Sequence, residues 1–344
     1  MRRHLIIGSL TAALTIAVAG PASADSFSLT SGEATALAGV SPFAMTVSGS
    51  TDRVFYGSSN PMGWALASCT GTVCSSPAAL PVTFGADYTE VTLTDGTQRA
   101  YFVNPASGKV LTTAPVAYDA QGTPTLGAAT ALGISAPAGQ NAWGVPDSVV
   151  LPDGRVRLYW VTMPAGGKAS GPTKAQISCL AKQLGKKRVN AIGSGAKPNA
   201  KDKKALRKCK IDPSLLSGGR SSQPQEVIVS ATSTDASGTS FAQDPGTRFT
   251  GGYVDSDIVQ AKDGDWIALL STGPGAPPQQ LYAATSKDGL TWKVDSKALT
   301  GSSVNSLDPS AVPAGPNTWR VYWSQSPKAT PFSNHTIVVG TLTR

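Results

Sequence analysis

The sequence predicts an all-β protein, folded as a five-bladed β-propeller whose blades have four strands each. The first observation is the composition, which is rich in Gly and Pro and has only 15% charged residues. Helix-period patterns are rare outside one segment. The second observation is a hairpin pattern that occurs five times, and the third is a likeness between the chain's start and a later outer strand. Repeats with a fixed pattern are typical of propellers.

Each repeat reads as a small apolar strand, a turn, a second strand rich in Tyr, Trp and Phe, and a loop that ends in Pro. The five segments are residues 41–61, 87–105, 147–164, 255–274 and 308–327. Three of the turns are Asp-Gly, at Asp95, Asp153 and Asp263, which is a strong hairpin signal. We therefore expect the first strand of each repeat to be the inner strand of a blade.

The outer strands predict how the ring closes. Segments after the first four repeats read as second strand pairs, whereas the fifth is followed only by "HTIVVGTLTR". The segment "FSLTSGEATALAG" from Phe27 resembles "PTLGAATALGIS" at the end of the second repeat. We expect the N-terminal strand to complete the last blade, which protects the sheet edges. A β-sandwich is the alternative, but it does not predict matched hairpins or an exchange of chain ends.

Residues 1–24 read as a secretory signal, with Arg2 and Arg3, an apolar run, and the small residues "PASA" before Asp25. A membrane anchor is the alternative, but the run is short. We expect a secreted, extracellular protein with its propeller over 25–344 and no transmembrane segment after cleavage. Only one histidine, His335, follows the signal, which excludes a His-rich zinc site.

Export predicts that the four cysteines form disulfides. Four cysteines allow three pairings, and the local one is the simplest. It joins Cys69 to Cys74 and Cys179 to Cys209.

One segment departs from the all-β pattern, and we call it the basic insert (168–212). Its residues 168–210 hold thirteen Lys or Arg and a single acid, Asp202. Apolar spacing predicts one helix over 175–192 and a second that starts after an N-cap at Asn199. We expect a helical hairpin clamped by Cys179–Cys209. Binding of anionic polymers is one interpretation, and a solvated loop excursion is the other.

Aspartates recur at the starts of the inner strands, at Asp87, Asp147, Asp255 or Asp257, and Asp308. We take Asp87, Asp147, Asp257 and Asp308 as candidate catalytic residues. In a propeller these starts converge at one mouth of the channel. Carboxyls held close together raise the pKa of at least one of them, which supplies the acid and base of glycoside hydrolysis. The alternative is that each Asp caps a strand or pairs with an Arg of the second strands.

Aromatic side chains near these aspartates are candidates for stacking on a sugar. They are Tyr88, Trp143 and Tyr253.

The inner hairpins "DSVVLPDGRVRLYWV", "DSDIVQAKDGDW" and "DPSAV" resemble those of the five-bladed glycoside hydrolases of the arabinosidase, xylosidase and fructosidase type. The resemblance covers most of the chain outside the basic insert and implies glycosidase-like chemistry at the inner-strand aspartates. That family also uses a Glu as the acid. Here Glu33, Glu90 and Glu226 do not match its motif, so the acid does not transfer.

A second resemblance is to the Asp-box turn of sialidases. The segment "SKDGLTW" matches it through Ser286, Asp288, Gly289 and Trp292. The resemblance implies a structural turn on an outer hairpin, away from any active site.

We expect no cofactor. Asp255-x-Asp257 and Asp263-x-Asp265 carry oxygens that could hold a structural calcium, but solvated turn acids are the simpler interpretation. The predicted partner is a carbohydrate or an anionic cell-surface polymer, and we expect a monomer without a nucleic-acid partner. The predicted function is glycan binding at the channel mouth, with glycoside hydrolysis left open. The alternative is a non-catalytic adhesin or scaffold that acts through the basic insert.

Overall fold

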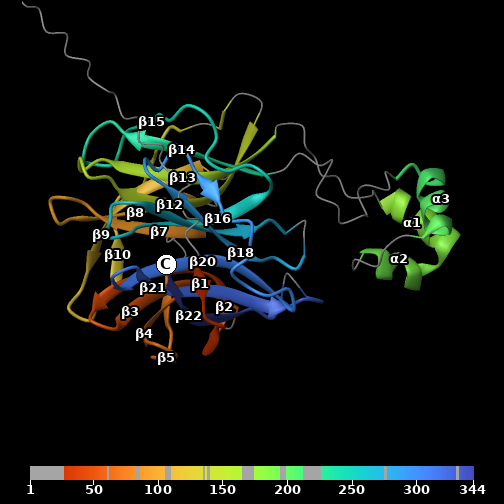
Figure 1. The fold of residues 1–344 in the computed structure, drawn as a ribbon, viewed down its shortest axis with the longest axis horizontal. Helices are drawn as coiled ribbons and strands as arrows, with labels where there is room; N and C mark the ends of the chain where they lie inside the picture. Colours follow the sequence, from red (N-terminus) through yellow and green to blue (C-terminus); the bar gives the residue numbers. More distant parts are fainter. Residues whose placement is uncertain are drawn as a thin grey trace, which may run out of the picture.

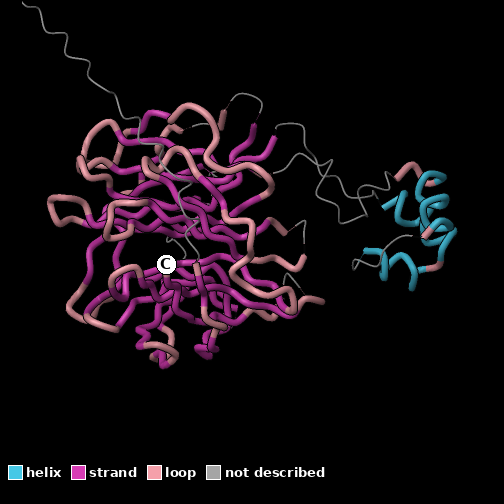
Figure 2. The backbone as a smooth tube through the Cα atoms, viewed as in Figure 1, coloured by secondary structure: helices cyan, strands magenta, loops and turns pink. Residues whose placement is uncertain are grey.

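The computed structural model describes most of the chain that follows the predicted signal segment. The described ranges are 27–59, 62–81, 86–104, 110–134, 136–137, 140–164, 174–193, 199–211, 226–274, 277–330 and 333–344. The predicted signal segment 1–24 lies outside them. Antiparallel β-sheets make up the body of the molecule, and three helices stand apart from it (Figures 1 and 2). Within the described part, no helix is long and apolar enough to span a membrane.

The largest sheet joins strands from the two ends of the chain, in the order β20-β21-β22-β2-β3-β4-β5. β1 pairs with β22, and β6 pairs with β4. Its strands are β1 (Ser28–Leu29), β2 (Glu33–Ser48), β3 (Thr51–Ser59), β4 (Met62–Thr70), β5 (Val73–Cys74), β6 (Ala78–Leu80), β20 (Val304–Gly315), β21 (Thr318–Pro327) and β22 (Thr336–Thr343).

β2 takes part in two antiparallel pairings. Its start pairs with β22 (Glu33 opposite Val339), and its later part pairs with β3 (Ala44 opposite Val54). The side chain of Thr35 also donates a hydrogen bond to the backbone oxygen of Ile337, at 2.7 Å. The first strands of the chain therefore hold the last one.

The other sheets are meanders of consecutive strands. One contains β7 (Ala86–Thr92), β8 (Gln98–Asn104), β9 (Val110–Tyr118), β10 (Pro124–Leu126) and β11 (Thr130–Ala131). The next contains β12 (Gln140–Val150), β13 (Val156–Pro164), β14 (Val227–Ser233) and β15 (Phe241–Gln243). The third contains β16 (Tyr253–Gln260), β17 (Trp266–Thr272), β18 (Leu281–Ser286) and β19 (Lys293–Val294).

Tight turns close the inner hairpins as predicted. Gly96, Gly154 and Gly264 have φ near +85°, a left-handed conformation that glycine adopts without a steric penalty. Each donates its N–H to a carbonyl three residues earlier, which closes the turn. The Asp-Gly signal therefore placed these three hairpins correctly.

Hydrophobic clusters fill the spaces between neighbouring sheets. Tyr56 and Tyr322, for example, pack between β2–β4 and β20–β22. Further clusters join β2–β4 to β7–β9, β7–β9 to β12–β14, β12–β14 to β16–β18, and β16–β18 to β20–β22. Each of these groups of strands thus packs against two neighbouring groups. Between the groups, β2, β7, β12, β16 and β20 each contact their neighbours in this order.

The two disulfides join Cys69 to Cys74 and Cys179 to Cys209, which confirms the local pairing. The second one lies in the basic insert, which contains α1 (Lys174–Leu184), α2 (Lys186–Gly193) and α3 (Ala200–Lys208). The single helix predicted over 175–192 was wrong. Gly185 adopts φ +81° and ends α1, so the described part of the insert has three helices.

Candidate functional site

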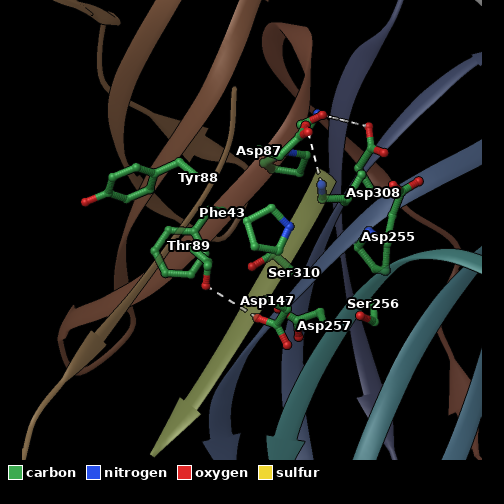
Figure 3. Close-up of a pocket in the computed structure, with 15 residues that line it drawn as sticks. Phe43, Asp87, Tyr88, Thr89, Asp147, Asp255, Ser256, Asp257, Asp308 and Ser310 are labelled. Carbon is green, nitrogen blue, oxygen red and sulfur yellow. Dashed lines mark hydrogen bonds between the residues drawn. The ribbon is translucent and has the colours of Figure 1, made fainter. Parts of the chain in front are cut away.

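Three consecutive residues from each of β2, β7, β12, β16 and β20 line one pocket, which we call the acidic pocket (Figure 3). The lining residues are Ser41, Pro42, Phe43, Asp87, Tyr88, Thr89, Val145, Pro146, Asp147, Asp255, Ser256, Asp257, Asp308, Pro309 and Ser310. Its cavity volume is about 50 Å³. Five carboxyls from four strands converge on this pocket.

The same backbone irregularity positions every triplet. The first residue of each has φ between +50° and +53°, in Ser41, Asp87, Val145, Asp255 and Asp308. A shift in strand register accompanies each one. A β-bulge redirects side chains, so that the first and third residues of each triplet can both line the pocket. This left-handed conformation costs about 1–2 kcal/mol for a residue with a side chain, and such strain clusters at functional sites.

The bulge also corrects the sequence alignment, which gave Asp87, Asp147, Asp257 and Asp308 the same position. Asp147 and Asp257 are the third residues of their triplets, whereas Asp87 and Asp308 are first. Asp255 is first on β16. We call the first residues, all half-exposed, the outer layer, and the third residues, mostly buried, the inner layer. Figure 3 shows the two levels.

The outer-layer carboxylate of Asp308 is held by three donors. Its Oδ2 accepts hydrogen bonds from the backbone N–H of Ser41 (3.1 Å) and from the hydroxyls of Ser41 (3.2 Å) and Ser324 (3.1 Å). Asp87 is held in a related way, because its Oδ2 accepts the N–H of Val145 at 3.3 Å. In both cases the carboxyl of one strand binds the first triplet residue of the next strand around the pocket.

Asp255 is the outer-layer acid on β16, and its surroundings raise its pKa. Burial raises its pKa well above the usual range, and the negative charge of Asp308 and a hydrogen bond with Asp308 raise it further. The charge of Asp87 acts in the same direction. The hydroxyl of Ser271 donates to its Oδ2 at 2.7 Å. Asp255 therefore keeps its proton to higher pH than an ordinary aspartate does.

Three inner-layer side chains each accept a hydrogen bond from a backbone N–H of the neighbouring strand. Asp147 Oδ2 accepts the N–H of Ile258 at 2.7 Å, and Asp257 Oδ2 accepts the N–H of Ala311 at 3.0 Å. Ser310 Oγ continues this pattern by accepting the N–H of Ala44 at 3.0 Å. These carboxyls therefore have a structural role as well as a place in the pocket wall.

Burial raises the pKa of both inner carboxyls. It raises the pKa of Asp257 to about 7. It raises the pKa of Asp147 well above the usual range, and the charge of Asp257 adds to that effect. Near neutral pH this pair therefore holds at least one proton.

Arginines of the second strands do not neutralise the acidic pocket in the contacts of the described residues. Arg157 pairs with Asp244 at 3.4 Å, and Arg320 pairs with Asp52 at 2.6 Å. The predicted alternative, in which the repeated Asp and Arg pair with each other, is wrong for these two arginines.

The aromatic candidates occupy different places. Tyr88 lines the pocket, but it is buried, its ring lies 5.0 Å from that of Phe55, and its hydroxyl donates to Glu90 at 2.5 Å. Tyr253 packs on Tyr282 and is not among the lining residues. The side chain of Trp143 lies outside the described residues.

Phe43 is the aromatic side chain that sequence reasoning missed. It is the third residue of its triplet, is half-exposed and lines the pocket. It stands where β12 and β16 carry Asp147 and Asp257. The Ser-Pro-Phe, Val-Pro-Asp and Asp-Pro-Ser triplets share a central Pro, and that signal could have aligned it.

None of the described residues lining the pocket is a glutamate. Glu90 lies one residue beyond the β7 triplet, where it accepts hydrogen bonds from Tyr88 and from Tyr118 (2.7 Å). Burial raises its pKa. Among the described residues, no group of three or more His, Cys, Asp or Glu side chains is arranged to hold a metal ion.

The turn after β18 is organised by Asp288. Its Oδ1 accepts the N–H groups of Leu290 (2.8 Å) and Thr291 (2.7 Å) and the hydroxyl of Ser286 (2.9 Å). Gly289 donates its N–H to Ser286 Oγ at 2.9 Å. These hydrogen bonds lower the pKa of Asp288 to about 2, although partial burial opposes them. Trp292 packs against Phe249, with ring centroids 5.1 Å apart.

Comparisons with known proteins show the fold. No protein-family model and no curated protein sequence matches the chain. Among solved structures, an endo-arabinase of Bacteroides thetaiotaomicron is 12% identical with a TM-score of 0.51, and the match covers 92% of this chain and 96% of that one. An endo-1,4-beta-xylanase of the same organism is 11% identical with a TM-score of 0.54, over 90% and 92% of the two chains.

A third structure is a glycoside hydrolase family 43 arabinoxylan arabinofuranohydrolase of Bacillus subtilis. It is 14% identical with a TM-score of 0.51, over 88% of this chain and 63% of that one. The resemblance to β-propeller glycoside hydrolases of the arabinosidase and xylosidase type, inferred from the inner hairpins, is thus confirmed at the level of the fold.

Proposed function

We propose that this chain is a secreted five-bladed β-propeller that binds a carbohydrate in the acidic pocket and hydrolyses its glycosidic bond. In this proposal each inner-strand triplet belongs to one blade. The N-terminal strands complete the blade of β20–β22, in keeping with the pairing of β1 and β2 with β22. The convergence of five carboxyls on one pocket, some protonated and some available as bases, carries the proposal.

Asp255 is our candidate for the general acid. Burial and the charge of Asp308 raise its pKa well above the usual range, so it keeps its proton to higher pH than an ordinary aspartate, and it is half-exposed in the outer layer. A protonated carboxyl can donate to the leaving oxygen of a glycosidic bond. This assignment supplies an acid without the family's glutamate.

Asp87 is our candidate for the general base or nucleophile. It is half-exposed in the outer layer and comes from β7, which is separated from β16 by β12 in the order of the strands around the pocket. A sugar between these strands would meet an acid on one side and a carboxylate on the other. Phe43 offers an aromatic face at the same pocket for contact with a sugar ring.

Asp308, Asp147 and Asp257 support this chemistry in the proposal. Asp308 shares a hydrogen bond with Asp255, which sets the protonation of the acid. The inner pair fixes neighbouring strands through Ile258 and Ala311. We therefore give Asp255 and Asp87 precedence over Asp147 and Asp257 as reacting groups.

The experiment compares sugar release by the wild type, Asp255→Asn and Asp87→Asn on arabinan, xylan, bacterial wall glycans and sialylated glycans. Each substitution keeps the side chain's shape and removes its acid–base chemistry. We expect release to fall at least 100-fold for both variants, as for loss of a general acid or base. Asp95→Asn is the control, because Asp95 lies in the turn at the other end of the β7–β8 hairpin.

Retention of a single glycan with no sugar release would instead support the binding role without catalysis. The scaffold alternative predicts that neither pocket variant changes glycan retention. Sugar release that survives in Asp255→Asn would exclude this carboxyl as the acid.

A further inference from the structure

We propose that the basic insert binds a linear acidic polysaccharide along the cationic side of α3. The insert leaves the β-body between β13 and β14, and none of its described residues lines the acidic pocket. This proposal rests on the proposed function in one respect: the polymer held by the insert is taken to be a carbohydrate.

The insert has a core of its own, so its charges are held in a defined arrangement. Leu180, Leu206 and Ile211 are each no more than 2% exposed, and they pack together in one cluster. The disulfide between Cys179 and Cys209 ties α1 to the residue that follows α3.

The start of α3 is also fixed. Asn199 caps it by accepting the N–H of Asp202 at 3.0 Å, and Asp202 accepts the N–H of Asn199 at 2.8 Å. Arg188 of α2 pairs with the same carboxylate, with Nε 3.1 Å from Oδ2. Asp202 is the only acid in 168–210 and is buried in this pair, and the next acid along the chain is Asp212.

The exposed side of α3 is cationic along its whole length. Lys201, Lys204 and Lys208 follow the spacing i, i+3, i+7 and lie on one stripe of the helix, and all three are exposed. Lys203 and Arg207 form a second exposed stripe at i, i+4. Like charges at these spacings oppose helix formation, so the disulfide and the core of the insert hold α3 against the repulsion of its own cations.

The chemistry of the insert favours a polysaccharide over other polyanions. The segment 168–210 contains no Phe, Tyr or Trp, so it offers no ring on which a nucleic-acid base could stack. Eleven of its thirteen cations are lysines, which act as flexible point charges and can neutralise an extended anion without imposing one fixed geometry. An extended polymer with regularly spaced carboxylates or sulfates complements such a stripe.

The test uses the full-length protein and the triple variant Lys201→Gln/Lys204→Gln/Lys208→Gln. The matched control is Lys262→Gln/Lys293→Gln/Lys297→Gln, which removes the same charge from exposed lysines of the β-body. The probes are polygalacturonate for carboxylates, dextran sulfate for sulfates, neutral dextran as a blank, and single-stranded oligothymidylate. Affinity is measured between 50 and 300 mM salt.

We expect the α3 variant to bind polygalacturonate or dextran sulfate about tenfold more weakly at low salt, and the control to bind like the wild type. The slope of log affinity against log salt should become shallower by about 2–3 for three lost contacts. The polymer whose binding weakens shows whether the insert recognises carboxylates or sulfates. Circular dichroism at 222 nm establishes that the α3 variant keeps its helices.

Equal losses in the two triple variants would overturn the proposal, because they would indicate a response to net charge alone. Tighter binding of oligothymidylate than of either polysaccharide would also overturn it. Failure here is separate from failure of the acidic pocket, because sugar release from neutral arabinan does not depend on these lysines and is measured on the same variants.

Discussion

Asp147 accepts a hydrogen bond from the backbone N–H of Ile258 at 2.7 Å, so a carboxyl on the pocket wall also joins β12 to β16. Replacing Asp147 with Ala leaves that N–H without its acceptor in a buried setting. Such a group costs about 1–3 kcal/mol. We therefore expect Asp147→Ala to unfold at lower urea concentration than Asp147→Asn, in which the amide oxygen can still accept. Equal midpoints for the two variants would contradict this role.

Asp257 predicts a fall in stability as the pH rises from about 4 to 7. Its pKa rises from an ordinary value of 3.8 in the unfolded chain to about 7 in the folded one. Between these values the folded state binds a proton that the unfolded state has lost, so the folded state's advantage declines with pH. The decline is about 4 kcal/mol at most for this group.

Asp257→Asn should abolish that part of the pH dependence, because the amide does not titrate. Urea unfolding of both proteins at pH 4 and pH 7 measures it. The variant should gain stability relative to the wild type as the pH rises. The same difference at the two pH values would count against a raised pKa.

For Asp288 we expect the opposite pH dependence of stability, in the acid range. Its pKa is lowered to about 2, so its contribution is present above pH 4 and is lost as the pH falls toward 2. Asp288→Ala removes the acceptor of two backbone N–H groups, and we expect a loss of about 1 kcal/mol at pH 7. Glycan binding at the acidic pocket should not change. A loss of binding would place this turn in the site.

The disulfide of the basic insert predicts local unfolding. Cys179 and Cys209 are 30 residues apart, and closing a loop of that size stabilises by about 3–4 kcal/mol in the chain-entropy model. Cys179→Ser/Cys209→Ser should lose amide protection in α1 and α3, while the β-strands keep theirs. Hydrogen exchange measures both, and loss of protection in β12–β15 as well would show that insert and sheets unfold together.

Local signals in the sequence predicted the local structure well. The Asp-Gly turns, the cap at Asn199 and the two disulfides each depend on a few neighbouring residues, and all were predicted correctly. The break at Gly185 was equally local, because a glycine at the end of an apolar stripe is a helix-stop signal. There the prediction extended a helix that the sequence itself could have ended.

The acidic pocket was harder to predict, because it depends on backbone geometry that side-chain type does not encode. Asp147 and Asp308 both start an apolar run, yet a bulge places them on different layers. The pKa values of these aspartates were equally hard to predict from the sequence. Asp255 and Asp257 are two residues apart in sequence, and only their surroundings in the fold determine how each binds its proton.

The pairing of β1 and β2 with β22 has a consequence for the time at which the protein can fold. The hydrogen bond from Thr35 to Ile337 spans 302 residues, so β1 and the start of β2 cannot pair with β22 until the end of the chain exists. Contacts of such separation form late, because a long chain must be ordered before they are made. Throughout synthesis the edge formed by the start of β2 stays open to other chains. Removing β22 would therefore expose the edges at both ends of the chain at once.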